Sequence, residues 1–418
     1  MNQVTPTPGG DPLFANGVDF TVLLIVAGKA VLTFAVLLIA VLFMVWFERK
    51  IISDMQNRVG PDKAGKWGVL QSLADGIKLF FKEDLLPDRA DRKVFRLAPY
   101  LAAVPAFLAF SIVPLGGIVT IAGHQTRLQL ADPPIGILFL LAMSSVAVYG
   151  VMLAGWSSGS KYPLLGSVRA SAQMVSYEAA LALSVAATVL ASGSLVVSEI
   201  VDHQARSGIG GFLPGWNILQ TAFIPFFVFL IAATAELNRP PFDLVEAEQE
   251  LVGGFHTEYS SIRFALFFLA EFMNTVTMSA IAVTLFLGGP SGPVFGFLPW
   301  VWPILWFVAK TFLFLFMYVW FRATLPRLRY DQLMDLGWKV LIPLSLLWLL
   351  VLAGMRLGNF WGFAVFGAGL VGWLMLSQAL KIGRQNSEAA TFPAGHPNPA
   401  SSGAWGPTPT PGRSPGDN

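Results

Sequence analysis

The stretch IPFFVFLIAATAELNRPPFDLVEAEQELVGG, residues 224–254, joins an almost wholly apolar half to a half that is rich in carboxylates. An apolar segment of about 20 residues can cross a lipid bilayer as an α-helix. The apolar half therefore predicts the end of a spanning helix, and the acidic half predicts a loop at the membrane surface. The only basic residue in the stretch is Arg239. Its carboxylate residues are Glu236, Asp243, Glu246, Glu248 and Glu250.

The whole chain has the composition of a membrane protein. Of its 418 residues, 55% are hydrophobic and only 12% are charged, and its mean hydropathy is +0.62. A soluble domain carries roughly 25% charged residues. We therefore expect an all-α fold, namely a polytopic membrane protein with about nine transmembrane helices plus cytoplasmic amphipathic helices. The spanning helices are predicted at 20–47, 97–119, 135–155, 173–194, 218–236, 263–287, 303–323, 338–354 and 360–380.

Polar tails flank this helical domain, which we place at residues 20–384. The N-terminal tail is predicted at 1–19, and residues 1–18 lack the basic and apolar regions of a secretory signal peptide. Residues 385–418 are rich in Pro, Gly, Ser and Asn, a composition that predicts a disordered tail.

Basic residues predict the orientation of the chain in the membrane. Most Lys and Arg residues fall in one set of predicted loops, whereas the other set holds only Arg127, Arg206 and Arg356. Loops rich in Lys and Arg stay in the cytoplasm. We therefore expect a multi-pass protein of the bacterial inner membrane, with the N-terminus outside and the C-terminus cytoplasmic. The same rule explains the cluster of arginines after the seventh predicted helix, without a further function.

The first cytoplasmic loop contains an amphipathic segment, VLQSLADGIKLFFKED, residues 69–84. Its polar face carries Asp75 and Lys78. A helix of this kind lies in the membrane interface. Two interpretations stay open: a topological anchor, or one wall of an entrance for a lipid-soluble substrate. The apolar face is formed by Leu70, Leu73, Ile77, Phe80 and Phe81.

Four ionisable residues fall within predicted spans: Lys29, Glu178, Glu271 and Lys310. A charge at bilayer depth costs from ~2.5 kcal/mol upward, so it normally faces the protein interior and has a partner or water. One interpretation is a structural Glu–Lys pair between packed helices. The other, which we favour, is a path for protons or ions. Lys29 is close enough to the outer surface for its side chain to reach the interface.

The acidic loop has helical spacing of its own. Asp243, Glu246 and Glu250 would share one face of a helix that begins after Pro240–Pro241, because proline favours the first helical turn. Closely packed carboxylates have raised pKa values and can hold and pass protons near neutral pH. An acidic face that contacts a basic partner protein is an equally good interpretation.

The residue inventory excludes several kinds of redox site. The chain has no cysteine, which excludes thiolate-bound Fe–S clusters, c-type haem attachment and thiolate zinc sites in this chain. None of its four histidines lies inside a long apolar segment, where a membrane-buried haem needs them. No P-loop or dinucleotide-binding glycine pattern is apparent. We therefore expect this chain to bind no metal or flavin, and no nucleic acid.

The cytoplasmic loops, taken together, resemble one known family. They resemble the chain-H subunit of NADH-quinone oxidoreductase, respiratory complex I, over about residues 20–380. One departure is Leu237, where the family more often has Thr, which affects local hydrogen bonding. The matching stretches are ERKIISDMQNRVGP (48–61), GWSSGSKYPLLGSVRASAQMVSYE (155–178), AELNRPPFDLVEAEQELVGGFHTEYS (235–260) and RATLPRLRYDQLMDLGWK (322–339).

This resemblance implies a membrane subunit of a proton-pumping enzyme. The family chain anchors the peripheral Fe–S and NADH-oxidising arm beside the antiporter-like membrane arm. It forms much of the chamber in which a quinone, ubiquinone or menaquinone, is reduced. The substrate enters from the lipid, and the redox centres belong to partner subunits.

The resemblance also assigns residues to two groups. A path for protons or charge from the chamber into the membrane arm would involve Glu178, Glu236, Glu246, Glu248, Glu271, Lys310, Arg322 and Arg327. The quinone path would be bordered by Arg49, Arg58, Asp75, Arg239, Asp243, Phe255 and Tyr259, together with Glu236, Glu246 and Glu248.

Two other functions are compatible with parts of the sequence. A stand-alone ion or proton transporter would explain the charges within the spans, but it has little need of long charged cytoplasmic loops. The membrane anchor of a related hydrogenase shares a weaker form of the same motifs. The full length of ERKIISDMQNRVGP and AELNRPPFD favours the quinone enzyme.

Overall fold

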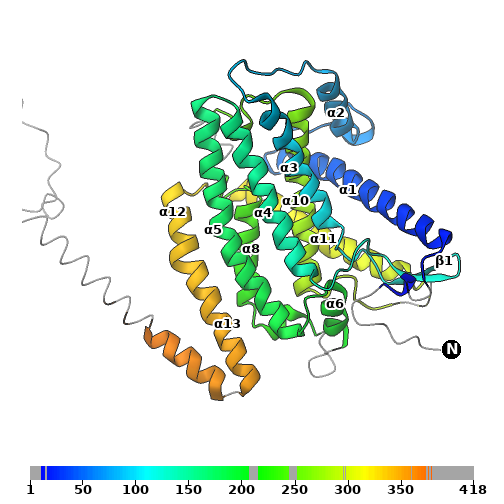
Figure 1. The fold of residues 1–418 in the computed structure, drawn as a ribbon, viewed down its shortest axis with the longest axis vertical. Helices are drawn as coiled ribbons and strands as arrows, with labels where there is room; N and C mark the ends of the chain where they lie inside the picture. The colour runs from blue at the N-terminus through cyan, green and yellow to red at the C-terminus, as the bar shows by residue number, and fades with distance from the viewer. Residues whose placement is uncertain are drawn as a thin grey trace, which may run out of the picture.

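The computed structural model describes residues 11–14, 17–206, 215–243, 252–294, 296, 298–358, 360–372, 375 and 378. Most of this part of the chain is helical (Figure 1). The long helices are α1 (Phe20–Met55), α3 (Arg92–Phe110), α4 (Gly136–Ser157), α5 (Lys161–Ser192), α8 (Ile224–Glu236), α10 (Ser261–Phe286), α11 (Val301–Thr324) and α13 (Ile342–Leu357).

Shorter elements connect these helices. An antiparallel hairpin pairs two strands in the register Ile118 with Arg127. The short helices are α2 (Gln71–Phe81), α6 (Val197–Arg206), α7 (Asn217–Gln220) and α12 (Tyr330–Leu336), and the strands are β1 (Ile118–Ile121) and β2 (His124–Arg127). Single 3₁₀ turns lie at Pro12–Phe14, Lys66–Gly68 and Gly254–His256, and a π-helical turn at Gly337–Leu341 joins α12 to α13.

The polytopic helical fold is confirmed. Among the described residues, 7 helices are long and apolar enough to cross a membrane, the last of them running over Tyr330–Leu357. Two further predicted spans are shorter helices, Ile224–Glu236 and Phe360–Gly372. The first of these is short because Ala222 and Phe223 have positive φ angles of 56° and 66°, which end α7 and prevent one continuous helix.

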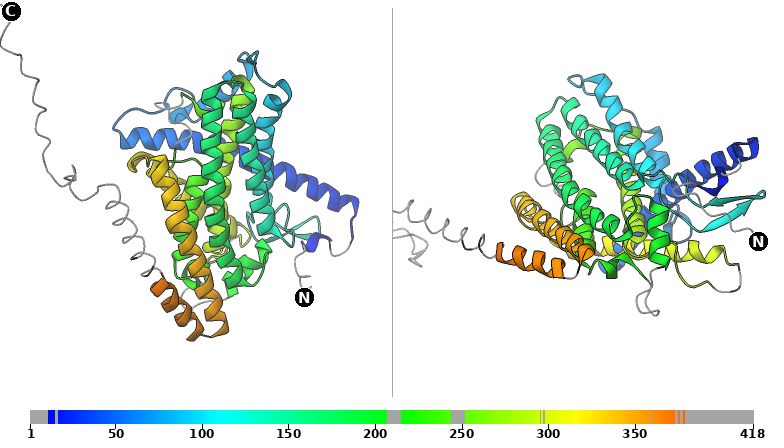
Figure 2. Two further views of the ribbon diagram at one scale, coloured as in Figure 1. Left: turned by 60° about the vertical axis from the view of Figure 1, so that its left-hand side comes forward. Right: turned by 60° about the horizontal axis from the view of Figure 1, so that its bottom comes forward.

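The helices form an upright bundle that one helix crosses. Helices α4, α5, α8 and α10 run side by side, and α1 crosses this bundle at a steep angle (Figures 1 and 2). Small residues allow the bundle to pack closely. A Cβ atom added at Gly150 of α4 would lie 2.7 Å from the backbone nitrogen of Ala102 in α3, so the two backbones are nearly in contact.

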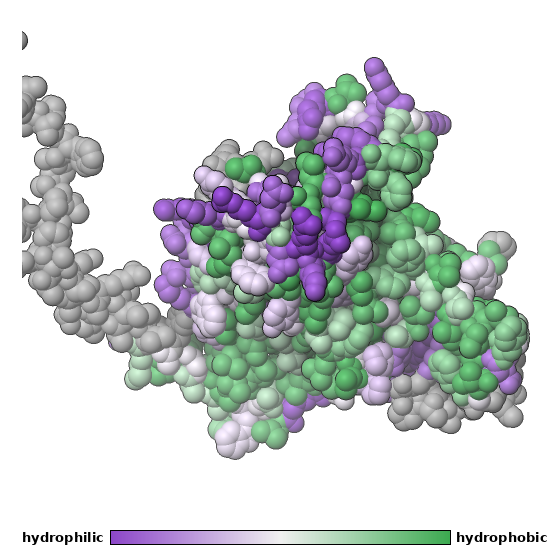
Figure 3. All heavy atoms as spheres, turned by 45° about the horizontal axis from the view of Figure 1, so that its top comes forward, coloured by the Kyte–Doolittle hydropathy of each residue, from purple (hydrophilic) through white to green (hydrophobic). Residues whose placement is uncertain are grey.

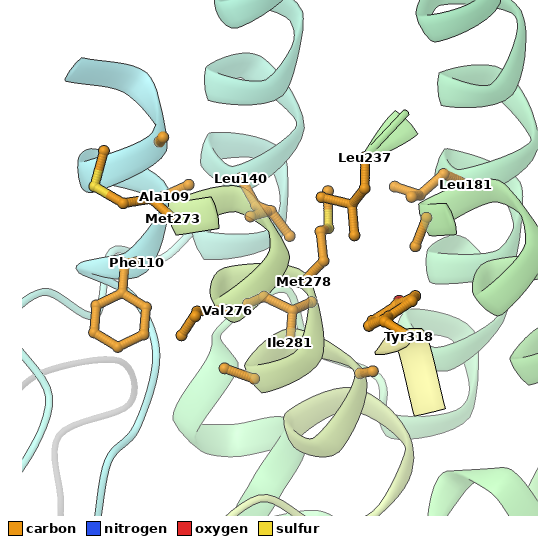
Figure 4. Packing of buried hydrophobic residues seen from close by; sticks show 14 of the residues in the cluster. Ala109, Phe110, Leu140, Leu181, Leu237, Met273, Val276, Met278, Ile281 and Tyr318 are labelled. Carbon is orange, nitrogen blue, oxygen red and sulfur yellow. The ribbon is translucent and has the colours of Figure 1, made fainter. Parts of the chain in front are cut away.

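Helix α10 lies at the centre of the apolar core. Met273, Val276 and Ile281 are each at most 4% exposed and pack among side chains of the surrounding helices (Figure 4). Those neighbours include Leu140 of α4 and Leu181 of α5. Because its surroundings are protein on most sides, a polar side chain on α10 is held in the interior rather than in lipid.

The amphipathic helix is confirmed at Gln71–Phe81, within the predicted segment 69–84. Its apolar side chains face outward: Ile77 is 53% exposed and Phe81 is 82% exposed. Helix α2 lies at the same end of the bundle as many hydrophilic residues, above a belt of apolar ones (Figures 1 and 3). This arrangement suits a helix at the boundary between lipid and water.

Candidate functional site

Arg239 lies in a tight turn that follows α8. The backbone folds back there, because Arg239 donates its N–H to the carbonyl of Thr234 at 3.2 Å and Phe242 donates to the carbonyl of Arg239 at 2.9 Å. Gln173 of α5 holds the same turn by donating to the carbonyls of Ala235 and Phe242, at 2.7 and 2.9 Å. The turn directs the Arg239 side chain into the bundle, where it is 4% exposed.

The guanidinium of Arg239 joins the turn after α8 to two helices. It contacts Glu48 of α1 at 2.8 Å and Glu271 of α10 at 3.3 Å, and it lies 4.6 Å from the ring centre of Phe272. Glu48, which is 3% exposed, also pairs with Arg322 of α11. Buried charges persist only when they are paired and hydrogen-bonded. We call these four ionisable residues, Glu48, Arg239, Glu271 and Arg322, the Arg239 cluster.

Glu48 was not predicted as a site residue. It begins the stretch ERKIISDMQNRVGP and follows a long apolar run, so the sequence places it at the membrane surface. The helix continues to Met55, and the steep course of α1 brings Glu48 against a residue 191 positions away in the chain. The sequence carries no signal for this contact.

Two further ion pairs lie near the cluster. Asp243, in the turn after α8, pairs with Arg327 at 2.8 Å, and only the arginine is substantially exposed. Arg49 of α1 pairs with Asp75 of α2 at 2.5 Å, which joins the amphipathic helix to the bundle. Arg58 is exposed and donates to the side chain of Gln56 at 2.7 Å.

A polar cavity of about 620 Å³ opens beside the Arg239 cluster. Ligand pockets typically measure roughly 300–1,000 Å³. The cavity is lined by charged side chains of α1 and α11 and by two aromatic rings of α10. Its lining includes Glu48, Arg49, Arg58, Phe268, Phe272 and Arg322.

Two smaller cavities lie inside the bundle and share lining residues with one another or with the polar cavity. The inner cavity, of about 60 Å³, is lined by Phe268, Glu271, Asn274 and Glu236, and Phe268 also borders the polar cavity. The small cavity, of about 20 Å³, is lined by Asn274, Glu236 and Ser144. About 10–15 Å³ is enough for one water molecule. Water-sized spaces therefore lead from Glu271 past Asn274 to Glu236.

The deeper carboxylates are held by two serines of α4. Glu236, which is 8% exposed, accepts a hydrogen bond from Ser144, and Glu178 of α5 accepts one from Ser145. Both carboxylates thus face the interior of the bundle, as the cost of charge in lipid predicts. Neither serine was predicted, because a serine within an apolar helix has no distinctive pattern.

Lys310 lies apart from these carboxylates. Its ammonium donates to the carbonyls of Leu287, Gly289 and Ser291, at 2.8, 3.0 and 2.8 Å. Those carbonyls follow the C-terminal end of α10, which favours a positive charge. One interpretation of the sequence is a Glu–Lys pair between helices. In the structure, Lys310 instead binds carbonyls of the loop after α10.

The Lys29 side chain is buried, at 8% exposed, and reaches residues that lie outside the predicted spans. Its ammonium is 2.7 Å from a carboxylate oxygen of Asp11 and 3.0 Å from the hydroxyl of Thr126. Burial alone would raise the pKa of Asp11. The bonds from Lys29 and from the backbone N–H of Leu13 outweigh burial and hold that pKa below its ordinary value.

Tyr259 and Phe255 flank the inner part of the site. The Tyr259 ring stacks on Phe95 with centroids 3.9 Å apart, and its hydroxyl donates to the Phe95 carbonyl at 3.1 Å. Burial raises the pKa of Tyr259 to about 12, so the hydroxyl stays protonated near neutral pH. Phe255 lines the inner cavity beside His256.

Part of the predicted site cannot be placed. Glu246 and Glu248 lie outside the described residues, and so does the predicted acidic helix beyond Asp243. Within the described ranges, no group of three or more His, Asp or Glu side chains is arranged to hold a metal ion.

Comparison with known proteins agrees with this architecture. The sequence model of a family described as NADH dehydrogenase matches residues 28–353. The H subunit of NADH-quinone oxidoreductase from Frankia alni is 54% identical over 364 residues, which cover 84% of this chain and 78% of the relative. The Streptomyces avermitilis protein of the same name is 47% identical over 409 residues, or 94% and 88% of the two chains.

A third relative gives the same result. The protein of that name from Frankia casuarinae is 54% identical over 334 residues, which cover 78% of this chain and 72% of the relative. The family match over residues 28–353 includes all four residues of the Arg239 cluster. The chain therefore belongs to the family of NADH-quinone oxidoreductase H subunits and is a membrane subunit of that enzyme complex.

Proposed function

We propose that this subunit forms much of the quinone-binding chamber and couples quinone reduction to proton translocation. The observation that carries the proposal is the position of the Arg239 cluster. It lies between the polar cavity on one side and the buried carboxylates of the bundle on the other.

The polar cavity suits the head group of a quinone. A quinone ring is flat and carries two carbonyl oxygens, which accept hydrogen bonds. Arg49, Arg58 and Arg322 supply donors at the wall, and Phe268 and Phe272 supply aromatic surface. Helix α2, which is joined to the edge of this cavity by the Arg49–Asp75 pair, presents an apolar face along which a lipid-soluble substrate would enter.

Quinone reduction changes charge beside the cluster. Quinol formation takes up two electrons, supplied by the peripheral arm, and two protons. Two unit charges about 10 Å apart interact by roughly 2 kcal/mol at an effective dielectric constant of ~20. An energy of that size moves a protonation equilibrium more than tenfold. The Arg239 cluster would therefore respond to a transient negative charge in the cavity.

A change of charge at the Arg239 cluster would pass to the carboxylates deeper in the bundle. Glu271 belongs to the cluster and also lines the inner cavity, where Asn274 and Glu236 lie beyond it. An amide side chain both donates and accepts hydrogen bonds, so Asn274 can bridge to water on either side. Protons or a rearrangement of charge would then reach Glu236 and Glu178. Arg327 would adjoin the start of this route through its pair with Asp243, whereas Lys310 binds the loop after α10, apart from the carboxylates.

The proposal includes the surroundings of the chain. The hydrophilic end that carries α2 would face the cytoplasm and receive the Fe–S and NADH-oxidising arm, with the N-terminus outside. The antiporter-like membrane arm would adjoin the bundle, and quinone and lipid would contact α1 and α2. The support is the concentration of Lys and Arg in the loops of that end.

Replacement of Glu271 by Gln tests the proposal. The change keeps size and hydrogen bonding but removes the charge opposite Arg239. We expect proton pumping driven by quinone reduction to fall about tenfold or more. Electron transfer from NADH to an artificial acceptor at the flavin should stay near the wild-type rate. The assay uses the intact complex in proteoliposomes with a pH-sensitive dye.

Glu199→Gln is the matched control, since Glu199 pairs with Ser194 in the segment after α5, away from the described cavities. This variant should pump normally. Normal pumping by Glu271→Gln as well would contradict the proposed coupling role.

A further inference from the structure

Helix α4 carries two neighbouring serines, and each contacts a different carboxylate. The hydroxyl of Ser144 donates to Glu236 of α8, and the hydroxyl of Ser145 donates to Glu178 of α5. Neighbouring side chains on a helix project about 100° apart. One point on α4 therefore faces two helices at once and holds both carboxylates.

We propose that Ser144 and Ser145 are positioning residues of the coupling route, which allow Glu236 and Glu178 to change protonation while staying hydrogen-bonded. The inference rests on the proposed function, because it assigns these serines a part in the same route. It adds a pair of hydroxyl groups that neither the sequence motifs nor the comparisons identify.

Ser145 has the hydrogen-bond partners that such a role needs. Besides Glu178, its hydroxyl lies 3.1 Å from the carbonyl of Leu141. A serine hydroxyl has one proton and two lone pairs. When Glu178 is ionised, the serine donates to the carboxylate. When Glu178 is protonated, the acid donates to the serine oxygen, and the serine proton turns to Leu141.

Both states need only a rotation of one hydroxyl. No helix has to move, and no buried polar group loses its partner in either state. An alanine at this position would leave Glu178 without this bond in both states. Because a hydrogen bond to an ionised carboxylate is about twice as strong as one to a neutral acid, the two losses differ and the balance between the two protonation states would change.

Ser144 holds its carboxylate differently. It lines the small cavity together with Glu236 and Asn274. It contacts the Oε1 atom of Glu236, while Oε2 of the same group is buried and has no hydrogen-bond partner among the described residues. That oxygen is the one left for water in the adjoining cavities. Ser144 thus fixes one oxygen and leaves the other to exchange a proton.

A buried serine of α5 does not share this arrangement. Ser184 of α5, which is 1% exposed, donates to the carbonyl of Leu181 in its own helix at 2.7 Å. That contact is the common one for serine within a helix. Ser184 therefore provides a matched control, since it is a buried serine without a carboxylate partner.

The experiment compares Ser144→Ala, Ser145→Ala, Ser144→Thr, Ser145→Thr and Ser184→Ala in the intact complex. Proton pumping and quinone reduction are measured in proteoliposomes, and electron transfer to an acceptor at the flavin measures assembly. We expect each alanine variant at 144 or 145 to lose about tenfold in pumping. The threonine variants, which keep a hydroxyl, should recover most of it, and Ser184→Ala should match the wild type.

A spectroscopic measurement separates this role from packing. Infrared difference spectra on quinone reduction report the carbonyl stretch of a protonated carboxyl group. We expect Ser145→Ala to shift or remove that band and Ser145→Thr to retain it. If Ser145→Thr does not assemble, Ser145→Cys replaces it, because cysteine keeps the shape with a weaker donor and should fall between alanine and serine.

The inference is overturned if the alanine variants pump normally while Glu178→Gln and Glu236→Gln are impaired. In that case the proposed function stands without the serines. Normal pumping by both Glu variants would instead remove the proposed route, and this inference with it. Equal losses in the alanine and threonine variants, with an unchanged infrared band, would show a packing defect and also overturn it.

Discussion

Arg239 is the residue whose loss would disturb the most contacts. Its guanidinium is nearly inaccessible and meets Glu48 and Glu271 from two different helices. Removal of one partner from a buried charged group costs about 3–5 kcal/mol, because the remaining charges stay unpaired. A conservative substitution is therefore more informative than alanine at this position.

Replacement of Arg239 by Lys is expected to slow quinone reduction by about tenfold or more. Lysine keeps the charge, but its single ammonium cannot reproduce the planar contact with two carboxylates and an aromatic ring. Electron transfer from NADH to an artificial acceptor at the flavin should change much less. Arg329→Lys serves as the control, since Arg329 is 82% exposed. Equal losses in both reactions would point to defective assembly instead.

Glu246 stays a prediction from the sequence alone, because it lies outside the described residues. Its replacement by Gln should impair quinone turnover or its coupling to pumping, while the complex still assembles. The reason is that an amide cannot take up the proton that a carboxylate beside the chamber would accept. Turnover and pumping measured in the same vesicles provide the check, and normal values for both would refute a role for the acidic loop.

Some residues of the site could be predicted from the sequence, and others could not. Glu178, Glu236 and Glu271 could be singled out because charge within an apolar segment is costly. Ser144 and Gln173 could not, since a polar uncharged side chain is tolerated in such helices and acquires meaning only through a partner. The contact of Glu48 with Arg239 depends on the course of a whole helix.

Among the elements, α2 was the most predictable and α8 the least. The spacing of apolar residues in 69–84 indicates a helix directly, and the structure places it at Gln71–Phe81. For 218–236, hydropathy alone predicts one continuous span. The break at Ala222 and Phe223 is a backbone feature that hydropathy does not encode. Helix α5 begins at Lys161, earlier than predicted, because a flanking polar segment can extend a spanning helix.

Helix α2 is joined to α1 through the Arg49–Asp75 pair, and we expect Asp75→Asn to affect substrate entry. Both side chains are partly exposed, at 45% and 33%, so the pair contributes only about 0–1 kcal/mol to stability. The variant should therefore assemble normally but show a KM for long-chain quinone raised several-fold, with kcat little changed. Lys78→Gln, on the same helix, is the control. A fall in kcat at constant KM would contradict a role in entry.

At the scale of the whole molecule, polar groups are arranged along a gradient from surface to core. Hydrophilic residues gather at the end that carries α2 (Figure 3), and the Arg239 cluster and the cavities follow inside the bundle. Composition alone predicts the apolar belt and the charged loops. The order of the cavities could not be predicted, because it depends on how α1, α10 and α11 cross.

The steep course of α1 has a further consequence. Its apolar part, 20–47, extends about 42 Å at ~1.5 Å per residue, whereas a bilayer's hydrocarbon core is ~30 Å thick. Tilting relieves this hydrophobic mismatch. Glu48 follows that apolar part directly, so membrane thickness would set how α1 meets Arg239. Quinone reductase activity, measured in lipids of graded acyl-chain length, should therefore pass through a maximum, while NADH oxidation at the flavin stays constant.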